Sequence, residues 1–297
     1  MTYQIPEEFR IPVASGGGKN LLTLEWAGTA GFKIEYGGKM LLIDPNVTRP
    51  RLPRYLFASL PINKELCREV FPKADEIFIG HSHYDHLQDA PEIAIRTGAT
   101  IHGSSSTAVV CRAWGVPEKQ IHVIKLWTPF QAAGLKVTFV PGIHGKAVMG
   151  RIPSPGPIAS VERVPMRGSE YRLGAVFGIL FETADGFRVF HSGSADLIDN
   201  EVEKVGAVDV LLICLAGRKH TPDYVKRLAS RLKPKVVIPH HYDNFFSPLK
   251  KGLKLLPGIR MDSFIEEARR ECPDSRMLIP ALFEKASFDT AAKKVLG

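Results

Sequence analysis

One hexapeptide constrains this chain more than any other feature, because it holds three of the ten histidines in 297 residues. It follows the short apolar segment Ile77–Ile79 and a glycine, and it reads HSHYDH. An extended chain sends residues i and i+2 to the same side, so His81 and His83 can bind one ion. Asp85 and His86 follow where the chain turns, and they can bind a second ion. Imidazole with carboxylate suits zinc, iron or manganese, whereas calcium prefers oxygen ligands alone.

The HSHYDH segment resembles the HxHxDH motif of the metallo-β-lactamase superfamily. This resemblance implies an α/β fold, namely an αββα sandwich of two mixed β-sheets flanked by helices. It also implies a hydrolytic site for one or two metal ions along the open edge of the sandwich. Because no internal repeat and no clear linker interrupts the chain, we expect residues 1–297 to form a single hydrolase domain.

The residue pattern agrees with an α/β sandwich. Alternating apolar residues and a Gly-Gly turn predict an antiparallel meander of three strands at Leu22–Trp26, Phe32–Tyr36 and Lys39–Ile43. A strand, helix, strand pattern follows the histidine motif, and we expect another short helix in the tail from Asp289. His102 and His122 lie inside predicted strands, so we interpret both as packed or hydrogen-bonded histidines rather than ligands.

The superfamily also requires ligands far downstream, and they occur in order. His144 follows the predicted strand Leu135–Val140 and would give the first site three imidazoles with an open position for water. His241 would join Asp85 and His86 at the second site. The family pattern Pro-x-His-Tyr favours His241 over its neighbour His240, which we expect to turn toward the core or a neighbouring loop.

One position departs from the family pattern. Relatives carry Ser-Gly-Asp after a later strand, and the aspartate bridges both metals, but this chain has Ser192-Gly193-Ser194. A neutral serine removes a charge that would offset the repulsion between two dications. Either Asp196 reaches in through a two-residue bulge, or the site is mononuclear or asymmetric; we expect Asp196 to be a ligand.

Asp44 also follows a predicted strand, just before Pro45. In relatives a similar aspartate supports a ligand histidine from behind, which fixes the orientation of the ring. The alternative interpretation is an Asp-Pro pair that starts a turn.

The chemistry implied by the resemblance is metal-dependent hydrolysis of a lactone, ester or phosphodiester. A bound cation lowers the pKa of water to about 7, so that metal-bound hydroxide is available, and polarises a carbonyl or phosphoryl oxygen. We expect Zn²⁺, one or two ions, with Mn²⁺ or Fe²⁺ as alternatives. Asp85 would orient the hydroxide, and the leaving group would be protonated by Tyr242, His220 or His240, which are candidates by position.

Two further segments, residues 24–32 and 42–45, resemble the branch that contains L-ascorbate-6-phosphate lactonase and the N-acyl-phosphatidylethanolamine phospholipase D-like proteins. A ribonuclease Z-like nuclease is an alternative enzyme. A metal-binding protein that senses or holds a ligand without hydrolysis is an alternative of another class, because the bridging aspartate is missing.

Residues 146–172 contain four prolines, three glycines and four arginines, a composition that disfavours helix and central strand. Long loops in compact domains are commonly functional. We hypothesise an insertion or lid over the metal site, with Arg163 and Arg167 directed at a small anionic substrate; the alternative is an exposed loop with solvated arginines. The net charge of +8 is compatible with such a substrate, and without a run of like charges or an RNA-binding signature we expect no nucleic-acid partner.

The chain shows no signal peptide pattern, and its longest apolar run, Val210–Ala216, is too short to span a bilayer. The four cysteines are scattered and form no CxxC pair, so we expect buried thiols in a reducing compartment and a cytoplasmic protein. Assembly into a homo-oligomer is left open by the sequence.

Overall fold

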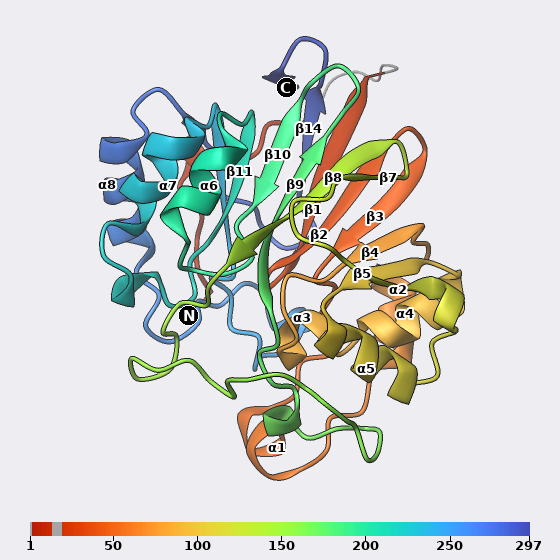
Figure 1. Ribbon diagram of the computed structural model, residues 1–297. Coiled ribbons are helices and arrows are strands. Elements are labelled where there is room, and N and C mark those ends of the chain that lie inside the picture. The colour runs from red at the N-terminus through yellow and green to blue at the C-terminus, as the bar shows by residue number, and fades with distance from the viewer. Residues whose placement is uncertain (1, 14–19) are drawn as a thin grey trace.

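The computed structural model describes residues 2–13 and 20–297 (Figure 1). Its strands form two sheets, and strands far apart in the sequence are neighbours in each. The first sheet has eight strands in the order β15-β14-β1-β2-β3-β4-β5-β6, and the second has seven in the order β13-β12-β11-β10-β9-β8-β7.

The first sheet is mixed. It begins with the predicted meander, whose strands pair in antiparallel fashion, and continues through three parallel pairings from β3 to β6. Its far edge pairs antiparallel with the end of the chain. Its strands are β1 (Leu21–Gly28), β2 (Gly31–Tyr36), β3 (Lys39–Ile43), β4 (Glu76–Phe78), β5 (Thr100–Gly103), β6 (Ile121–Val123), β14 (Lys285–Asp289) and β15 (Lys294–Val295).

The second sheet is mixed as well. Its hairpins from β7 to β10 are antiparallel, and β10, β11, β12 and β13 then run parallel. The two central parallel strands, β11 and β12, are almost wholly apolar, as expected of strands that are buried on both faces. Its strands are β7 (Phe130–Ala132), β8 (Leu135–Gly142), β9 (Val176–Glu182), β10 (Arg188–His191), β11 (Val210–Cys214), β12 (Val236–His240) and β13 (Arg276–Met277).

Helices cover the outer face of each sheet, and the two sheets pack against each other between them (Figure 1). The first sheet is covered by α2 (Lys64–Val70), α4 (Ala90–Thr97) and α5 (Ser105–Ala113), and the second by α6 (Asp199–Val205), α7 (Tyr224–Leu232) and α8 (Met261–Glu271). Shorter helices lie in the connections: α1 (Leu52–Phe57), α3 (Tyr84–Leu87), and the 3-10 turns Glu7–Phe9, Glu118–Gln120, Gly168–Glu170, Arg218–His220 and Leu249–Lys251. The predicted αββα sandwich of two mixed sheets is therefore confirmed.

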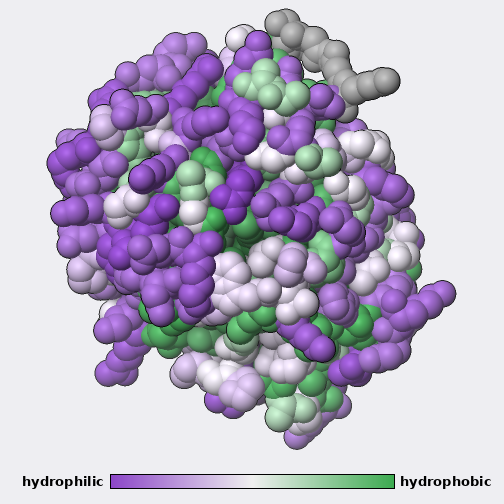
Figure 2. Space-filling model, turned by 45° about the horizontal axis from the view of Figure 1, so that its top comes forward, coloured by the Kyte–Doolittle hydropathy of each residue, from purple (hydrophilic) through white to green (hydrophobic). Residues whose placement is uncertain are grey.

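Side-chain burial follows the same layers. Large aromatic side chains such as Trp26, Phe139 and Phe181 fill the space between the sheets, and a second apolar cluster lies beneath α2, α4 and α5. All four cysteines are buried thiols, as the sequence predicted. On the face shown in Figure 2 the surface is mostly hydrophilic, with hydrophobic residues visible between the polar ones. In the described part of the chain, no helix is long and apolar enough to cross a membrane.

The predicted tail helix is wrong. Residues after Asp289 form a turn and then the edge strand β15, which pairs with β14. This pairing is a tertiary contact, which overrides the weak local preference of a short segment.

Candidate metal centre

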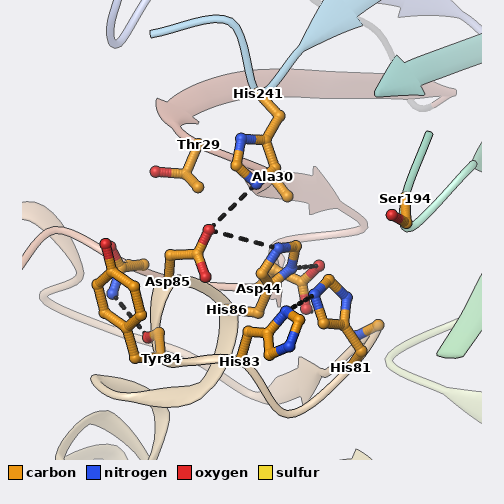
Figure 3. A network of polar contacts seen from close by, with 12 residues as sticks. Thr29, Ala30, Asp44, His81, His83, Tyr84, Asp85, His86, Ser194 and His241 are labelled. Carbon is orange, nitrogen blue, oxygen red and sulfur yellow. Dashed lines mark hydrogen bonds and ion pairs between the residues drawn. The ribbon is translucent and has the colours of Figure 1, made fainter. Parts of the chain in front are cut away.

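Five strands from both sheets end at the same edge of the sandwich, and each presents a polar side chain there (Figure 3). The HSHYDH segment follows β4. Asp44 follows β3, His144 follows β8, Ser194 follows β10 and His241 follows β12. Residues that are 160 positions apart in the sequence thus meet in one buried site. In the described part of the chain, six of these side chains form two groups of three potential metal ligands.

The first group consists of His81, His83 and His144, whose ligand atoms lie within 4.8 Å of one another and are buried. Nε2 of His81 lies 3.1 Å from Nδ1 of His83. Backbone carbonyls hold two of the rings from behind: Nε2 of His83 lies 3.0 Å from the Pro153 oxygen, and Nδ1 of His144 lies 2.6 Å from the Gly145 oxygen. Each of these rings therefore keeps its other nitrogen for the centre of the group.

The second group consists of Asp85, His86 and His241, also within 4.8 Å and buried. Oδ2 of Asp85 lies 3.2 Å from Nε2 of His241 and 3.8 Å from Nε2 of His86 (Figure 3). The other nitrogen of His86, Nδ1, donates to Oδ2 of Asp44 at 2.7 Å. The contact expected of Asp44 is present, and it leaves Nε2 of His86 free to bind a cation.

Asp44 is held tightly. Its other carboxylate oxygen accepts the backbone N–H of Gly80 at 2.7 Å, and its backbone has a positive φ of 41°. A Cβ on Gly80 would lie 2.9 Å from the Asp44 carboxylate, so only glycine allows the histidine segment to approach so closely.

A buried ion pair supports the loop of His241, and sequence reasoning missed it. Arg49 and Asp243 form this pair at 2.5 Å, with both side chains almost wholly buried. Asp243 also accepts the backbone N–H of Thr29 at 2.8 Å, while the carbonyl of Thr29 accepts the N–H of His241 at 2.7 Å. His241 has a φ of 58°, a conformation that such flanking contacts must maintain.

The protonation states suit cation binding. Burial and neighbouring histidines lower the pKa of His81 well below its usual value, and burial lowers the pKa of His83 to about 4 and that of His144 to about 3. These imidazoles are neutral at pH 7, as a metal ligand must be. In the second group, burial raises the pKa of Asp85, but the adjacent His86 and His241 outweigh it and lower the pKa overall.

His86 behaves in the opposite way. Burial lowers its pKa, but the carboxylates of Asp44 and Asp85 and the hydrogen bond to Asp44 outweigh burial and raise it overall. Three neutral imidazoles on one side, and two imidazoles with an ionised carboxylate on the other, match the donor sets that zinc, manganese or iron accept in proteins.

Ser194 lies where the family resemblance led us to expect a bridging aspartate. Its side chain is buried and lines the cavity above the two groups, and its Oγ accepts the N–H of Gly145 at 3.2 Å. Asp196 is not brought to either group: its carboxylate accepts the N–H of Leu197 at 2.8 Å and lies 3.5 Å from Nη1 of Arg227. The carboxylate of Asp196 is therefore directed at Arg227 of α7 rather than at either group.

The structure likewise does not bring the predicted acids to the site. Tyr242 is fully buried between the sheets, where its ring stacks on Trp26 at 4.5 Å and its hydroxyl donates to the Pro280 carbonyl. His220 is exposed and is absent from the described lining of the cavity. His240 stacks on His191 at 4.4 Å inside the core, as expected.

His102 and His122 are hydrogen-bonded to each other at 2.7 Å, as predicted, and neither belongs to the two groups found among the described residues.

A cavity of about 690 Å³ opens above both groups. Residues of the predicted lid line it, namely Ala147, Val148, Met149, Pro153 and Tyr171. The segment therefore lies at the site, but its contribution is apolar. Arg163 and Arg167 are exposed and do not belong to the described lining.

Several lining residues escaped sequence reasoning. They are Tyr55 of α1, Lys219, and the pair Phe245 and Phe246 after β12. The sequence offered no motif that would have identified these four residues. Tyr84 also lines the cavity, and its position inside the HSHYDH motif could have indicated this.

Comparison with known proteins gives a consistent result. The sequence pattern of the beta-lactamase superfamily domain matches residues 39–242. Among curated proteins, the chain is 29% identical over 249 residues to a UPF0173 metal-dependent hydrolase of Polynucleobacter asymbioticus, covering 81% of this chain and 80% of the relative. It is 30% identical over 263 residues to another of Thermodesulfovibrio yellowstonii, covering 82% of this chain and 84% of the relative.

Solved structures show the same fold. Igni18, a metallo hydrolase from Ignicoccus hospitalis, aligns with a TM-score of 0.61 and 23% identity over 90% of this chain and 98% of its own. The metallo-beta-lactamase fold protein YhfI from Bacillus subtilis aligns with a TM-score of 0.58 and 14% identity over 89% of this chain and 98% of its own.

Proposed function

Because this chain belongs to the beta-lactamase superfamily and is a metal-dependent hydrolase of the metallo-β-lactamase fold, we propose that it hydrolyses a carboxylic ester or a lactone. One observation carries the proposal: six donor side chains converge in two buried groups at the floor of a single cavity. We propose zinc as the metal, and His81, His83, His144, Asp85, His86 and His241 as its ligands, without Asp196.

In the hydrolysis, water adds to the carbonyl carbon, the bond to the leaving oxygen breaks, and a water proton ends on that oxygen. A bound dication supplies a water ligand of lowered pKa and polarises the carbonyl. Asp85 lines the cavity and has a lowered pKa, so its ionised carboxylate would accept a hydrogen bond from the attacking water. Lys219 and Tyr55 line the same cavity and are the candidates to donate a proton to the leaving oxygen, in place of Tyr242 and His220.

The charges of the site favour a carbonyl over a phosphodiester. Phosphoryl transfer spreads negative charge over three oxygens, and enzymes meet it with paired metals and basic side chains. Here Ser194 supplies no charge between the two groups, and Lys219 is the only lysine or arginine among the described lining residues. The branch relationship inferred from residues 24–32 and 42–45 stays a prediction.

We further propose that residues 146–172 form a cover over the cavity within a single domain. The Pro153 carbonyl faces His83, and Val148 and Met149 face the opening. A cover of this kind excludes water from the reacting carbonyl, which strengthens the electrostatic interactions below it.

Elemental analysis and a substrate panel test the proposal together. The protein, purified without added metal, is compared with His83→Ala and with a matched His122→Ala control, whose histidine is exposed and outside both groups. We expect one to two zinc per chain and turnover of esters or lactones. His83→Ala should lose the zinc of its own group and lower the turnover, and His122→Ala should change neither. Turnover of phosphodiesters alone would refute the ester and lactone assignment, and metal without any turnover would support a ligand-holding protein instead.

A further inference from the structure

We infer that the substrate carries a bulky apolar group, a medium-length alkyl chain or an aryl ring, beside its ester or lactone bond. This inference rests on the proposed hydrolysis and names the class of substrate for the same site. It differs from the small anionic substrate that the sequence predicted.

The walls of the cavity are apolar, whereas its polar atoms gather on the floor. Three separate segments build the walls: α1 contributes Leu56, the segment after β8 contributes Met149, and the segment after β12 contributes Phe245 and Phe246. Leu256 closes one side. A ligand that enters between these segments meets methyl, methylene and aromatic carbon on its way to the metal ligands.

The size of the cavity agrees with a substantial ligand. Its volume of about 690 Å³ lies within the range of roughly 300–1,000 Å³ that is typical of sites for drug-sized ligands. A water molecule takes about 30 Å³ in the liquid. An acetate ester would therefore leave most of the cavity filled with water against apolar walls, which is unfavourable.

The mouth of the cavity carries exposed hydrophobic side chains from two facing segments. Met149 is 94% exposed and Val148 53%, while Leu52 and Leu56 of α1 are 48% and 57% exposed. Single exposed apolar residues are common, but a group at the rim of a functional cavity indicates a binding surface. An apolar ligand would bury these side chains, and that burial supplies affinity.

Charge sets a limit on the rest of the substrate. Lys219 is the only lysine or arginine among the described residues that line the cavity, and it also borders a smaller adjoining cavity of about 310 Å³. One anionic group on the substrate can lie beside this ammonium. A molecule with several phosphates would lack partners.

Binding to the metal-free protein tests the walls without the chemistry. The probes are butyrate, hexanoate, octanoate and decanoate, and their Kd is measured by isothermal titration calorimetry after chelation of metal. We expect Kd to fall about threefold for each added methylene until the cavity is filled. In parallel, kcat/KM of the zinc-loaded enzyme is measured for the p-nitrophenyl esters of acetate and octanoate.

A rim variant then locates the effect. Leu56→Ser combined with Met149→Ser removes two exposed side chains, so the core is unaffected. The matched control is Phe57→Ser, since Phe57 is 81% exposed on the same helix but is not among the described lining residues. We expect the rim variant to lose about tenfold in octanoate affinity and in kcat/KM for the octanoate ester, to lose clearly less in kcat/KM for the acetate ester, and the control to match the parent.

The outcomes separate this inference from the proposed function. A Kd independent of chain length, or equal losses in the rim variant and the Phe57→Ser control, overturns the inference even if esters are hydrolysed. Binding that tightens with chain length, together with no ester or lactone turnover, supports the apolar site and refutes the proposed hydrolysis.

Discussion

The two groups of metal ligands differ in charge and in what supports them. The group of His81, His83 and His144 is neutral, and backbone carbonyls of two loops orient its rings. The group of Asp85, His86 and His241 contains a carboxylate and is backed by a second one, Asp44. The two proposed metal positions are therefore unequal, because the negative charge that attracts a cation is concentrated at the second group.

The absence of a bridging carboxylate sharpens this inequality. An aspartate at the place of Ser194 would share its charge between both metals, whereas the serine hydroxyl leaves the first group without any negative ligand. We therefore expect the carboxylate-containing group to bind a dication first and the three-histidine group to bind a second one more weakly.

The largest effect is expected from Asp85→Asn, which keeps the shape of the side chain and removes its charge. The second group should lose its metal, and kcat/KM for esters should fall by about a thousandfold, since a ligand and a water-orienting group are lost together. Metal content and steady-state kinetics measure this.

The matched control for Asp85→Asn is Asp274→Asn, an exposed aspartate in the turn before β13. If Asp85→Asn retained full metal content and its kcat/KM stayed within threefold of the parent, the second group would not be the dominant position.

Asp44→Asn should have the next largest effect. The neutral amide cannot replace the charged carboxylate as the hydrogen-bond acceptor of His86 Nδ1. The imidazole ring therefore loses its fixed orientation and some of its basicity. Loss of such a supporting contact typically lowers metal affinity 10- to 100-fold. Zinc titration against a competing chelator should show this loss for the second group only, and an equal loss in both groups would contradict the separation drawn here.

The sequence predicted the fold and most of the candidate ligands, for physical reasons that can be identified. Four ligands lie within six residues, so local spacing alone brings them together. His144 and His241 could be placed because each follows a strand, and strands of a sandwich end at shared edges. The resemblance to the family offered Asp44 as a support for one of the ligand histidines, with an Asp-Pro turn as the alternative, and the hydrogen bond is found with His86.

The predicted roles that the structure does not support depend on the direction in which side chains point from loops and turns. Asp196 lies two residues beyond Ser194, but its carboxylate pairs with Arg227 on α7, a contact that spacing cannot reveal. Tyr242 adjoins His241, yet the change of side between neighbours sends it into the core. In the segment 146–172, composition indicated a functional loop but could not tell that Met149 rather than Arg163 faces the cavity.

When the pH is lowered, the zinc affinity of the second group should decrease by about tenfold per pH unit relative to that of the first group. The raised pKa of His86 means that, as the pH falls, a proton competes with metal at the second group from a higher pH than at an ordinary histidine. The pKa values of about 4 for His83 and about 3 for His144 mean that the first group has no proton to displace until the pH approaches 4.

Two variants isolate the groups for this measurement. His81→Ala leaves the second group intact, and His241→Ala leaves the first. Zinc affinity between pH 8 and pH 5.5 should decline in His81→Ala and stay nearly constant in His241→Ala. If the zinc affinities of the two variants declined equally with falling pH, the buried carboxylates would not govern the competition between proton and metal at this site.

The smallest expected effect comes from Ser194→Asp, which restores the charge that relatives carry. Ser194 lines the cavity, so a longer side chain has room to reach between the groups. Because the new carboxylate would offset the repulsion between two dications, we expect about tenfold tighter binding of the weaker zinc, with the tighter one little changed. Ser194→Asn, of the same size without charge, is the control. If both variants tightened binding equally, geometry rather than charge would explain the inequality, and the comparison between the two groups would have to be drawn from their backbone supports instead.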